Sequence, residues 1–222
     1  YITDTELEFT FMNKRLKFYG WKYGDIASAF VFNEYDYLKV NNRVVIDIGA
    51  SIGDTAIYFA LKGASKVIAF EPFPRIFSIA EKNVRENGLE DKIVLVNAGC
   101  GYDGEVKIEA NFESDASTPL VNQNNGIVVP VYSLNTIISK FNIENNSILK
   151  VDCEGCEYPL ILHSKKDLIN KFYQIEIEYH YGYKILVKKL REYGFKVKYT
   201  LPKIIEVSSD RKYINGKIFA QR

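Results

Sequence analysis

The chain has 222 residues, of which 47% are hydrophobic and 14% aromatic, so it has ample material for a packed core and is not a globally disordered chain. Its formal net charge of +1 provides no overall field that would attract nucleic acid or a membrane surface. No apolar run approaches the ~20 residues of a membrane-spanning helix, and the first residues lack the charged-then-apolar order of a signal peptide. We therefore expect no membrane partner.

Residues 1–40 are aromatic and mixed in pattern, and we interpret them as an N-terminal extension that precedes a domain over residues 41–222. Within this extension, residues 5–18 predict an amphipathic helix, residues 30–32 a short strand and residues 34–38 a helical turn. The extension is a candidate for elaboration on the substrate side.

Strands and helices then alternate along the chain. Strands are predicted at residues 43–48, 66–70, 92–96, 147–151 and 172–178, and helices at 54–61, 72–87, 133–141, 158–170 and 184–193. Residues 101–131 predict a strand-rich excursion, and residues 195–200 and 212–220 an antiparallel pair.

This alternation predicts right-handed βαβ units and an α/β fold with helices on both faces of the sheet. The closing hairpin is more typical of a methyltransferase fold than of a plain dinucleotide-binding fold. We therefore expect a Rossmann-like class I methyltransferase fold, with a mostly parallel seven-stranded sheet and a C-terminal antiparallel hairpin.

A small-residue loop, Gly49-Ala50-Ser51-Ile52-Gly53, leaves the first predicted strand and enters a helix. Small residues let the backbone approach a ligand, and the helix start offers free N–H groups, which suits a nucleotide-like ligand. The NAD pattern would require glycine at position 51 and glycine or alanine at position 54, where this chain has Ser51 and Asp54. Asp47, at the end of the strand, would repel a pyrophosphate and attract the cationic amino acid end of S-adenosylmethionine (SAM).

Glu71 directly follows the second predicted strand, where an acid can accept hydrogen bonds from both ribose hydroxyls of a nucleoside. It could equally stabilise the start of the helix behind Pro72. After the third strand, Asn97 and Ala98 begin a small-residue loop that is expected to line an adenine slot, with ordinary turn chemistry as the alternative.

The fourth predicted strand ends in Asp152-Cys153-Glu154-Gly155-Cys156-Glu157. Charged groups at such a position must be paired or ligated, so Asp152 and Glu154 are candidates for substrate orientation, proton acceptance or a metal contact. Glu157 also suits the first turn of a helix.

The three cysteines are an odd count in a chain too large to need a disulfide framework, so we expect a reducing, cytoplasmic setting. A zinc site needs about four ligands, which the remaining cysteine and two histidines do not supply at a telling spacing. We therefore expect neither metal nor redox use of the pair Cys153 and Cys156, and we assign no metal ligands.

His180 follows the fifth predicted strand and shares a side of it with Glu178, because side chains alternate with a period of two. A histidine at this edge is a candidate general base, since its reference pKa lies near neutrality, although a structural histidine is the alternative.

Together these segments resemble the FkbM-type methyltransferases, a SAM-dependent family of mainly O-methyltransferases. The matching stretches lie at residues 44–55, 66–72, 96–98, 133–135, 149–157 and 176–180. The most specific of them is 149–157, which contains the pattern K-x-D-x-E-G-x-E. The resemblance implies SAM contacts at Asp47, Gly49, Gly53 and Glu71, and an active-site rim at Asp152, Glu154 and His180. Ser51 and Asn135 depart from the Asn and Asp that the family commonly has there.

We therefore predict a SAM-dependent methyltransferase that methylates an oxygen of a hydroxylated small molecule or sugar. The alternatives are an RNA (tRNA) methyltransferase that uses the basic run at residues 184–203, and a non-catalytic SAM-binding module. The predicted SAM-binding residues are Asp47, Gly49, Ala50, Ser51, Gly53, Asp54, Thr55, Glu71, Pro72, Asn97, Ala98 and Asp152, and the predicted catalytic residues are Asp152, Glu154 and His180.

Overall fold

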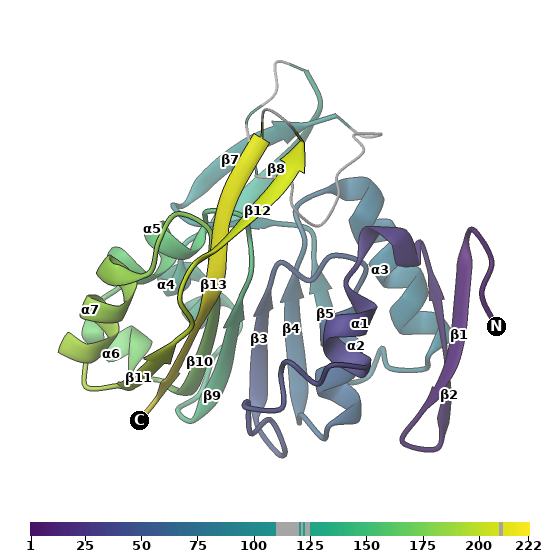
Figure 1. Ribbon diagram of the computed structural model, residues 1–222, viewed down its shortest axis with the longest axis horizontal. Helices are drawn as coiled ribbons and strands as arrows, with labels where there is room; N and C mark the ends of the chain where they lie inside the picture. Colours follow the sequence, from purple (N-terminus) through teal and green to yellow (C-terminus); the bar gives the residue numbers. More distant parts are fainter. Residues whose placement is uncertain (110–119, 121, 123–124, 209–210) are drawn as a thin grey trace.

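The computed structural model describes residues 1–109, 120, 122, 125–208 and 211–222 (Figure 1). The central sheet contains, in spatial order, β11 (Lys196–Tyr199), β13 (Arg211–Gln221), β10 (Phe172–Tyr179), β9 (Ser147–Val151), β3 (Val44–Ile48), β4 (Lys66–Phe70) and β5 (Ile93–Val96), and β12 (Lys203–Ser208) pairs with β13. The run from β10 to β5 is parallel, and β13 is antiparallel to its neighbours β10 and β11.

This strand order is that of a class I methyltransferase with its C-terminal antiparallel hairpin, as predicted. The predicted number of seven strands is wrong, because β12 adds an eighth strand to the sheet. The strand order reverses between β3 and β9, and ligands of open α/β sheets bind outside the carboxyl ends of the strands at such a point.

Two apolar cores cover the two faces of the sheet. Alternate residues of one strand face different cores: on β3, Val45 joins one core, whereas Ile46 and Ile48 join the other. The first core lies under α1 (Ile26–Phe30), α2 (Asp54–Leu61) and α3 (Pro74–Glu86), and the second under α4 (Leu134–Lys140), α5 (Glu157–Leu162), α6 (Lys166–Ile169) and α7 (Lys184–Glu192). In the described part of the chain, no helix is long and apolar enough to cross a membrane.

The N-terminal residues form a hairpin of β1 (Glu6–Phe11) and β2 (Lys14–Tyr19), so the helix predicted over residues 5–18 is wrong. Apolar side chains alternate with polar ones along both strands, and Leu16 and Phe18 are fully buried, which is the period of a half-buried strand. Met12 and Asn13 form the turn with positive φ angles.

The strand predicted at residues 30–32 is also wrong, because Phe30 ends α1, whose N-cap Asp25 accepts a hydrogen bond from the Ser28 N–H at 3.2 Å. A short 3-10 helix, η1 (Trp21–Tyr23), connects the hairpin to this helix. The helix predicted over residues 158–170 is divided into α5 and α6.

The hairpin is fastened to the rest of the molecule by α3. The Asn83 side chain, fully buried, accepts from the Tyr19 N–H at 2.7 Å and donates to the carbonyl oxygens of Tyr19 and Ile52 at 3.1 and 2.9 Å. One amide thereby ties the hairpin to the loop after β3.

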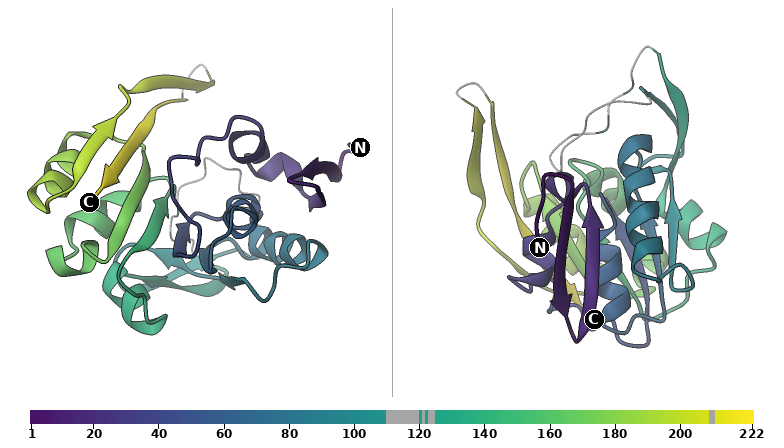
Figure 2. Two further views of the ribbon diagram at one scale, coloured as in Figure 1. Left: turned by 90° about the horizontal axis from the view of Figure 1, so that it is seen from below. Right: turned by 90° about the vertical axis from the view of Figure 1, so that its right-hand side faces the viewer.

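Two extensions project beyond the carboxyl end of the parallel strands (Figures 1 and 2). One is the paired β12 and β13, and the other is a small sheet of β6 (Gly99–Cys100), β8 (Ile127–Tyr132) and β7 (Gly104–Ile108). The strand-rich excursion predicted for residues 101–131 agrees with β7 and β8, and residues 110–119, 121 and 123–124 of that prediction lie outside the described residues.

Candidate active site

A cleft of about 850 Å³, partly open to solvent, lies at the carboxyl ends of β3, β4 and β9. The predicted residues that line it are Gly49, Ser51, Asp54, Thr55, Glu71, Pro72, Ala98, Asp152 and Glu154. The predicted residues outside its lining are Asp47, Ala50, Gly53, Asn97 and His180.

The loop after β3 brings two segments of backbone together. Gly49 has a φ of +79°, and a Cβ at this residue would lie 1.7 Å from the carbonyl oxygen of Asp152. Glycine is thus required here by the approach of the turn after β9, rather than by a ligand. Ser51 has a φ of 47°, and its hydroxyl donates to the Tyr23 carbonyl at 2.9 Å.

Glu71 is buried at the floor of the cleft and holds the loop after β3 in place. One carboxylate oxygen accepts from the Ser51 N–H at 3.0 Å and the other from the Phe73 N–H at 2.9 Å. Burial raises the pKa of Glu71 to about 8, although the two N–H donors oppose this rise. Each oxygen retains a lone pair, so the carboxylate can still accept from a diol in the cleft.

Asp47 is completely buried and paired inside the protein. It accepts from the Thr55 hydroxyl at 2.6 Å, and the Lys150 ammonium lies 3.2 Å from its other oxygen. Lys150 also donates to the Gly49 carbonyl at 2.8 Å. Lys150 is therefore the cationic partner of Asp47, in the place where the sequence led us to expect the cationic end of SAM.

Two further predicted residues serve the backbone around the cleft. The Asn97 amide donates to the carbonyl oxygens of Glu71 and Pro72 at 2.9 and 3.0 Å, so it shapes the loop after β4 while Ala98 lines the cleft. Asp54 accepts from the Asp25 N–H at 2.9 Å, and burial raises its pKa to about 6.

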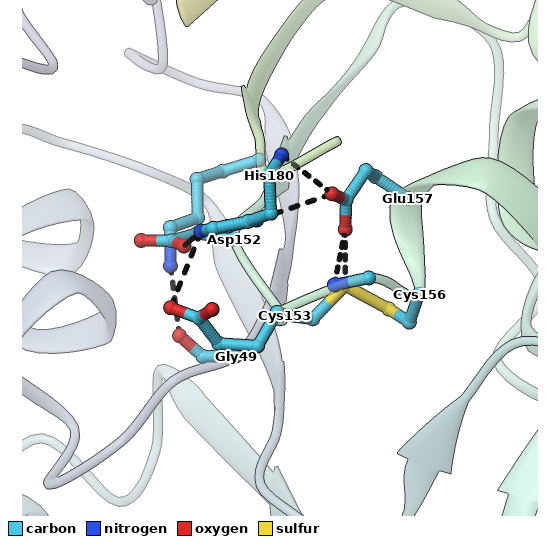
Figure 3. The surroundings of a disulfide bond; sticks show 9 residues. Gly49, Asp152, Cys153, Cys156, Glu157 and His180 are labelled. Atoms are coloured by element: carbon cyan, nitrogen blue, oxygen red, sulfur yellow. Dashed lines mark hydrogen bonds and ion pairs between the residues drawn. A yellow bond between two sulfur atoms is a disulfide. The ribbon is translucent and has the colours of Figure 1, made fainter. Parts of the chain in front are cut away.

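The turn after β9 contains a disulfide between Cys153 and Cys156, which the number of cysteines did not predict (Figure 3). A four-residue turn brings the two side chains together, and residues Glu154 and Gly155 inside it both have positive φ. Cys100 remains a free, buried thiol. The bond by itself assigns no redox role to the pair, so the expectation of no metal or redox use stays a prediction.

Glu157 is fully buried and organises this turn (Figure 3). It accepts from the Gly155 N–H at 2.8 Å and from the His180 N–H at 3.0 Å, and it lies 3.1 Å from His180 Nδ1. Glu157 therefore lies at the start of a helix, as the sequence indicates, and it also orients His180.

His180 is buried, and its other ring nitrogen faces acidic side chains. Its Nε2 lies 3.2 Å from Glu154, 3.8 Å from Glu178 and 3.9 Å from Asp152. Burial lowers the pKa of His180, but hydrogen bonds to Glu154 and Glu157 outweigh it and raise the pKa to about 10. In this arrangement the ring is a donor to carboxylates, which does not suit the predicted role of general base.

Several residues that shape the site were missed at the sequence level. Tyr23, Asp25 and Tyr35 line the cleft from the N-terminal region, and their sequence carries no motif. The role of Lys150 could have been predicted, because a lysine inside an apolar strand requires a buried anionic partner.

The comparisons with known proteins agree with this geometry. The family model described as the methyltransferase FkbM domain matches residues 47–197. The chain belongs to the FkbM methyltransferase family. The match includes both the loop after β3 and the turn after β9, as the sequence resemblance predicted.

More distant relatives are also methyltransferases. A stretch of 71 residues is 41% identical to ribosomal protein L11 methyltransferase of Carboxydothermus hydrogenoformans, covering 32% of this chain and 23% of that protein. The chain therefore spans about a quarter of the curated relative that it matches.

Among solved structures, the chain is similar to Trm5b of Pyrococcus abyssi, with a TM-score of 0.54, 16% identity and coverage of 97% of this chain and 56% of that one. It is also similar to Methanocaldococcus jannaschii Trm5 in complex with adenosine, with a TM-score of 0.52, 15% identity and coverage of 100% and 57%. At these identities the two structures support the fold alone.

Proposed function

We propose that this FkbM-family methyltransferase binds SAM in the cleft and transfers its methyl group to a hydroxyl oxygen of a small molecule or sugar. The observation that carries the proposal is the position of Glu71, whose carboxylate lines the cleft behind β4 beside the loop after β3. An acid at this place of a Rossmann-like sheet accepts hydrogen bonds from ribose hydroxyls.

The lining of the cleft fits the other parts of SAM. Apolar residues such as Ile48, Phe73 and Ile76 suit the adenine ring, and Asp54 and Thr55 at the start of α2 suit a polar, cationic end group. Asp152 and Glu154 line the opposite wall, which we assign to the acceptor. We further propose that residues 1–40 contribute to the acceptor side, because Tyr23 and Tyr35 reach the cleft.

When bound, SAM supplies an electrophilic methyl group, so that an oxygen–carbon bond forms as the carbon–sulfur bond breaks and its electron pair stays on sulfur. The chain's own contribution is alignment of the acceptor and removal of its proton. Asp152 and Glu154 are the proton acceptors in this proposal, since both line the cleft whereas His180 does not. His180 positions them through its contacts at 3.9 and 3.2 Å.

The RNA alternative receives less support from the site. The basic run at residues 184–203, with seven Lys or Arg and one Glu, contributes no residue to the described lining of the cleft. A cytoplasmic location stays a prediction, and the disulfide in the turn after β9 does not favour it.

Calorimetric titration with SAM tests the donor assignment. Glu71→Ala is expected to weaken SAM binding by about 10- to 100-fold, because hydrogen bonds to a charged carboxylate are lost. Glu81→Ala, which removes an exposed acid on α3, is the matched control and should bind as the wild type does. Absence of SAM binding to the wild type, or equal binding by Glu71→Ala, would refute the assignment.

The acceptor side is tested by methyl transfer to panels of hydroxylated small molecules and RNA. Asp152→Asn should reduce methyl transfer by about 10²- to 10⁴-fold if its carboxylate takes part in proton removal or orientation. Its affinity for SAM should change much less. Transfer to RNA alone, or SAM binding with no transfer to any acceptor, would favour one of the two alternatives.

A further inference from the structure

We propose that Asp152, Glu178 and His180 form a binding site for one divalent transition-metal ion at the acceptor wall of the cleft. The inference deepens the proposed function, on which its catalytic part rests, and the metal site itself is independent of SAM. The three residues come from the turn after β9 and from the carboxyl end of β10.

The spacing of the ligand atoms fits one ion. One potential ligand atom from each residue lies within 4.8 Å of the other two, and Nε2 of His180 is 3.9 Å from Asp152 and 3.8 Å from Glu178. Ligands bound at about 2.0–2.5 Å to a common ion lie about 3–5 Å apart, so the separations of these atoms match those of ligands around one ion. Glu178 and His180 are two residues apart, which places both on one side of β10.

Outer hydrogen-bond partners hold Glu178, on β10, and His180, which follows β10, as is usual for metal ligands. Glu157 lies 3.1 Å from Nδ1 of His180, which fixes the ring so that Nε2 faces the carboxylates (Figure 3). The Asn215 amide, from β13, donates to the Glu178 carboxylate at 2.8 Å. Such outer partners set the orientation of the ligands and strengthen their binding to metal.

The ligand atoms select the class of ion. One imidazole nitrogen with two carboxylates suits Mn²⁺, Fe²⁺, Co²⁺ or Zn²⁺, whereas Mg²⁺ and Ca²⁺ prefer oxygen ligands alone. Three protein ligands leave coordination positions open. Asp152 lines the cleft, so these positions can face an acceptor there.

The burial of the ligands explains why a cation would be retained. The His180 side chain is 2% exposed and those of Glu178 and Asp152 are 22% and 30% exposed, and a carboxylate oxygen of each acid lies within 4.8 Å of one of the other. Carboxylates in such surroundings repel one another unless a positive charge lies between them, which a bound ion would supply in place of the proton on His180. Glu154, with a side chain 17% exposed, adds a third carboxylate 3.2 Å from Nε2.

A bound ion would give Asp152 and Glu154, in the turn after β9, different roles. Asp152 would bind the ion, and the ion would bind the acceptor hydroxyl and increase its acidity. An ion on Nε2 would take the place of the ring proton there, which is released to solvent, and would end the contact of Nε2 with Glu154, so that the Glu154 carboxylate is available for the hydroxyl proton. The oxygen then attacks the methyl carbon, while the electron pair of the broken carbon–sulfur bond stays on sulfur.

Metal binding is measured without SAM or acceptor, by calorimetry and by electron paramagnetic resonance with Mn²⁺ on protein pretreated with chelator, and in parallel with Zn²⁺. The expected result is one ion per chain. Asp152→Asn and Glu178→Gln should each weaken binding by about 100-fold or more, and Glu157→Gln by about 10- to 100-fold through the orientation of His180. Glu192→Gln, an exposed acid on α7, is the control and should leave binding unchanged.

Thermal unfolding of each variant separates loss of a ligand from loss of the fold. No uptake of either ion at millimolar concentration, or binding to a folded Glu178→Gln as tight as to the wild type, would overturn the metal site. Methyl transfer that persists undiminished after complete chelation would overturn its catalytic part while the proposed function stands. Metal uptake that follows the expected pattern in a protein that does not bind SAM would support the site and refute the proposed function instead.

Discussion

The two walls of the cleft are built by different means. On the wall that we assign to SAM, the loop after β3 is shaped by backbone conformation and by one carboxylate, Glu71, which accepts from two N–H groups. On the opposite wall, four acidic residues surround both nitrogens of one buried histidine. The first wall is therefore formed mainly by main-chain groups in a fixed conformation, and the second by charged side chains.

This difference suits the two partners of a methyl transfer. A donor that is used unchanged in every reaction requires a fixed cradle, which small residues and main-chain donors provide. The acceptor must be oriented and must lose a proton, which requires side chains with titratable groups. Lys150 connects the two walls, because it is part of β9 and donates to the Gly49 carbonyl in the loop after β3.

Removal of this connection is expected to have the largest effect on stability. Lys150→Met leaves Asp47 as a buried carboxylate without its cation, which should lower the free energy of unfolding by about 3–5 kcal/mol. Chemical denaturation monitored by circular dichroism measures the change.

A double variant tests whether the unpaired charge is the cause. Asp47→Asn in the Lys150→Met background removes the charge and keeps an acceptor for the Thr55 hydroxyl, so it should recover most of the loss. A single variant as stable as the wild type would show that the pair does not hold the walls together.

The sequence predicted the donor wall better than the acceptor wall, for a physical reason. The loop after β3, Glu71 and Asn97 directly follow predicted strands, so their places depend only on strand order and on the carboxyl edge of the sheet. The contacts of Glu157 with His180, by contrast, depend on the depth at which α5 packs against β10, which a residue pattern does not specify. Asn215 belongs to a strand 37 residues beyond Glu178, and pairing of β13 with β10 is what brings them together.

Local mistakes in the prediction have equally specific causes. Residues 5–18 carry both a helical pattern and the alternation of β1 and β2, and pairing of the two strands across the turn at Met12 and Asn13 decides between them. The disulfide could not be inferred from the number of cysteines, because it depends on the positive φ values of Glu154 and Gly155, which fold the turn tightly enough to bring Cys153 and Cys156 together.

The disulfide allows a perturbation confined to the acceptor wall. It closes a very short loop, for which the chain-entropy model gives a stabilisation of about 2 kcal/mol. Reduction, or the double variant Cys153→Ser/Cys156→Ser, should therefore lower the free energy of unfolding by about this amount and reduce methyl transfer more than SAM binding.

Thiol titration of the unfolded protein checks that the bond exists. One reactive thiol, that of Cys100, is expected without reductant and three are expected with it. Three thiols without reductant would contradict the bridge, and a fall in SAM affinity equal to the fall in methyl transfer would show that the two walls do not respond separately.

An effect similar in size to that of the disulfide, about 2 kcal/mol between pH 6 and 8, is a pH dependence that arises on the donor wall from Glu71. Its pKa is about 8 in the folded protein against a reference value of 4.5, so the folded state without SAM holds a proton that the unfolded state releases. The resulting stabilisation is fully present below the reference value and is lost as the pH rises through about 8. Denaturation of the SAM-free protein at pH 6, 7 and 8 should therefore give a free energy of unfolding that decreases with pH.

SAM affinity should change in the opposite direction over the same range. Ribose hydroxyls donate more strongly to a charged carboxylate than to a protonated one, so binding of SAM to the wild type should strengthen as Glu71 loses its proton. In Glu71→Ala, the free energy of unfolding should fall less steeply with pH, and the affinity for SAM should not rise through the titration of residue 71. Because SAM itself also titrates, the difference between wild type and Glu71→Ala isolates the contribution of Glu71. If stability and SAM affinity changed with pH in the same direction in the wild type, Glu71 would be a structural carboxylate of the loop after β3 rather than the ribose ligand.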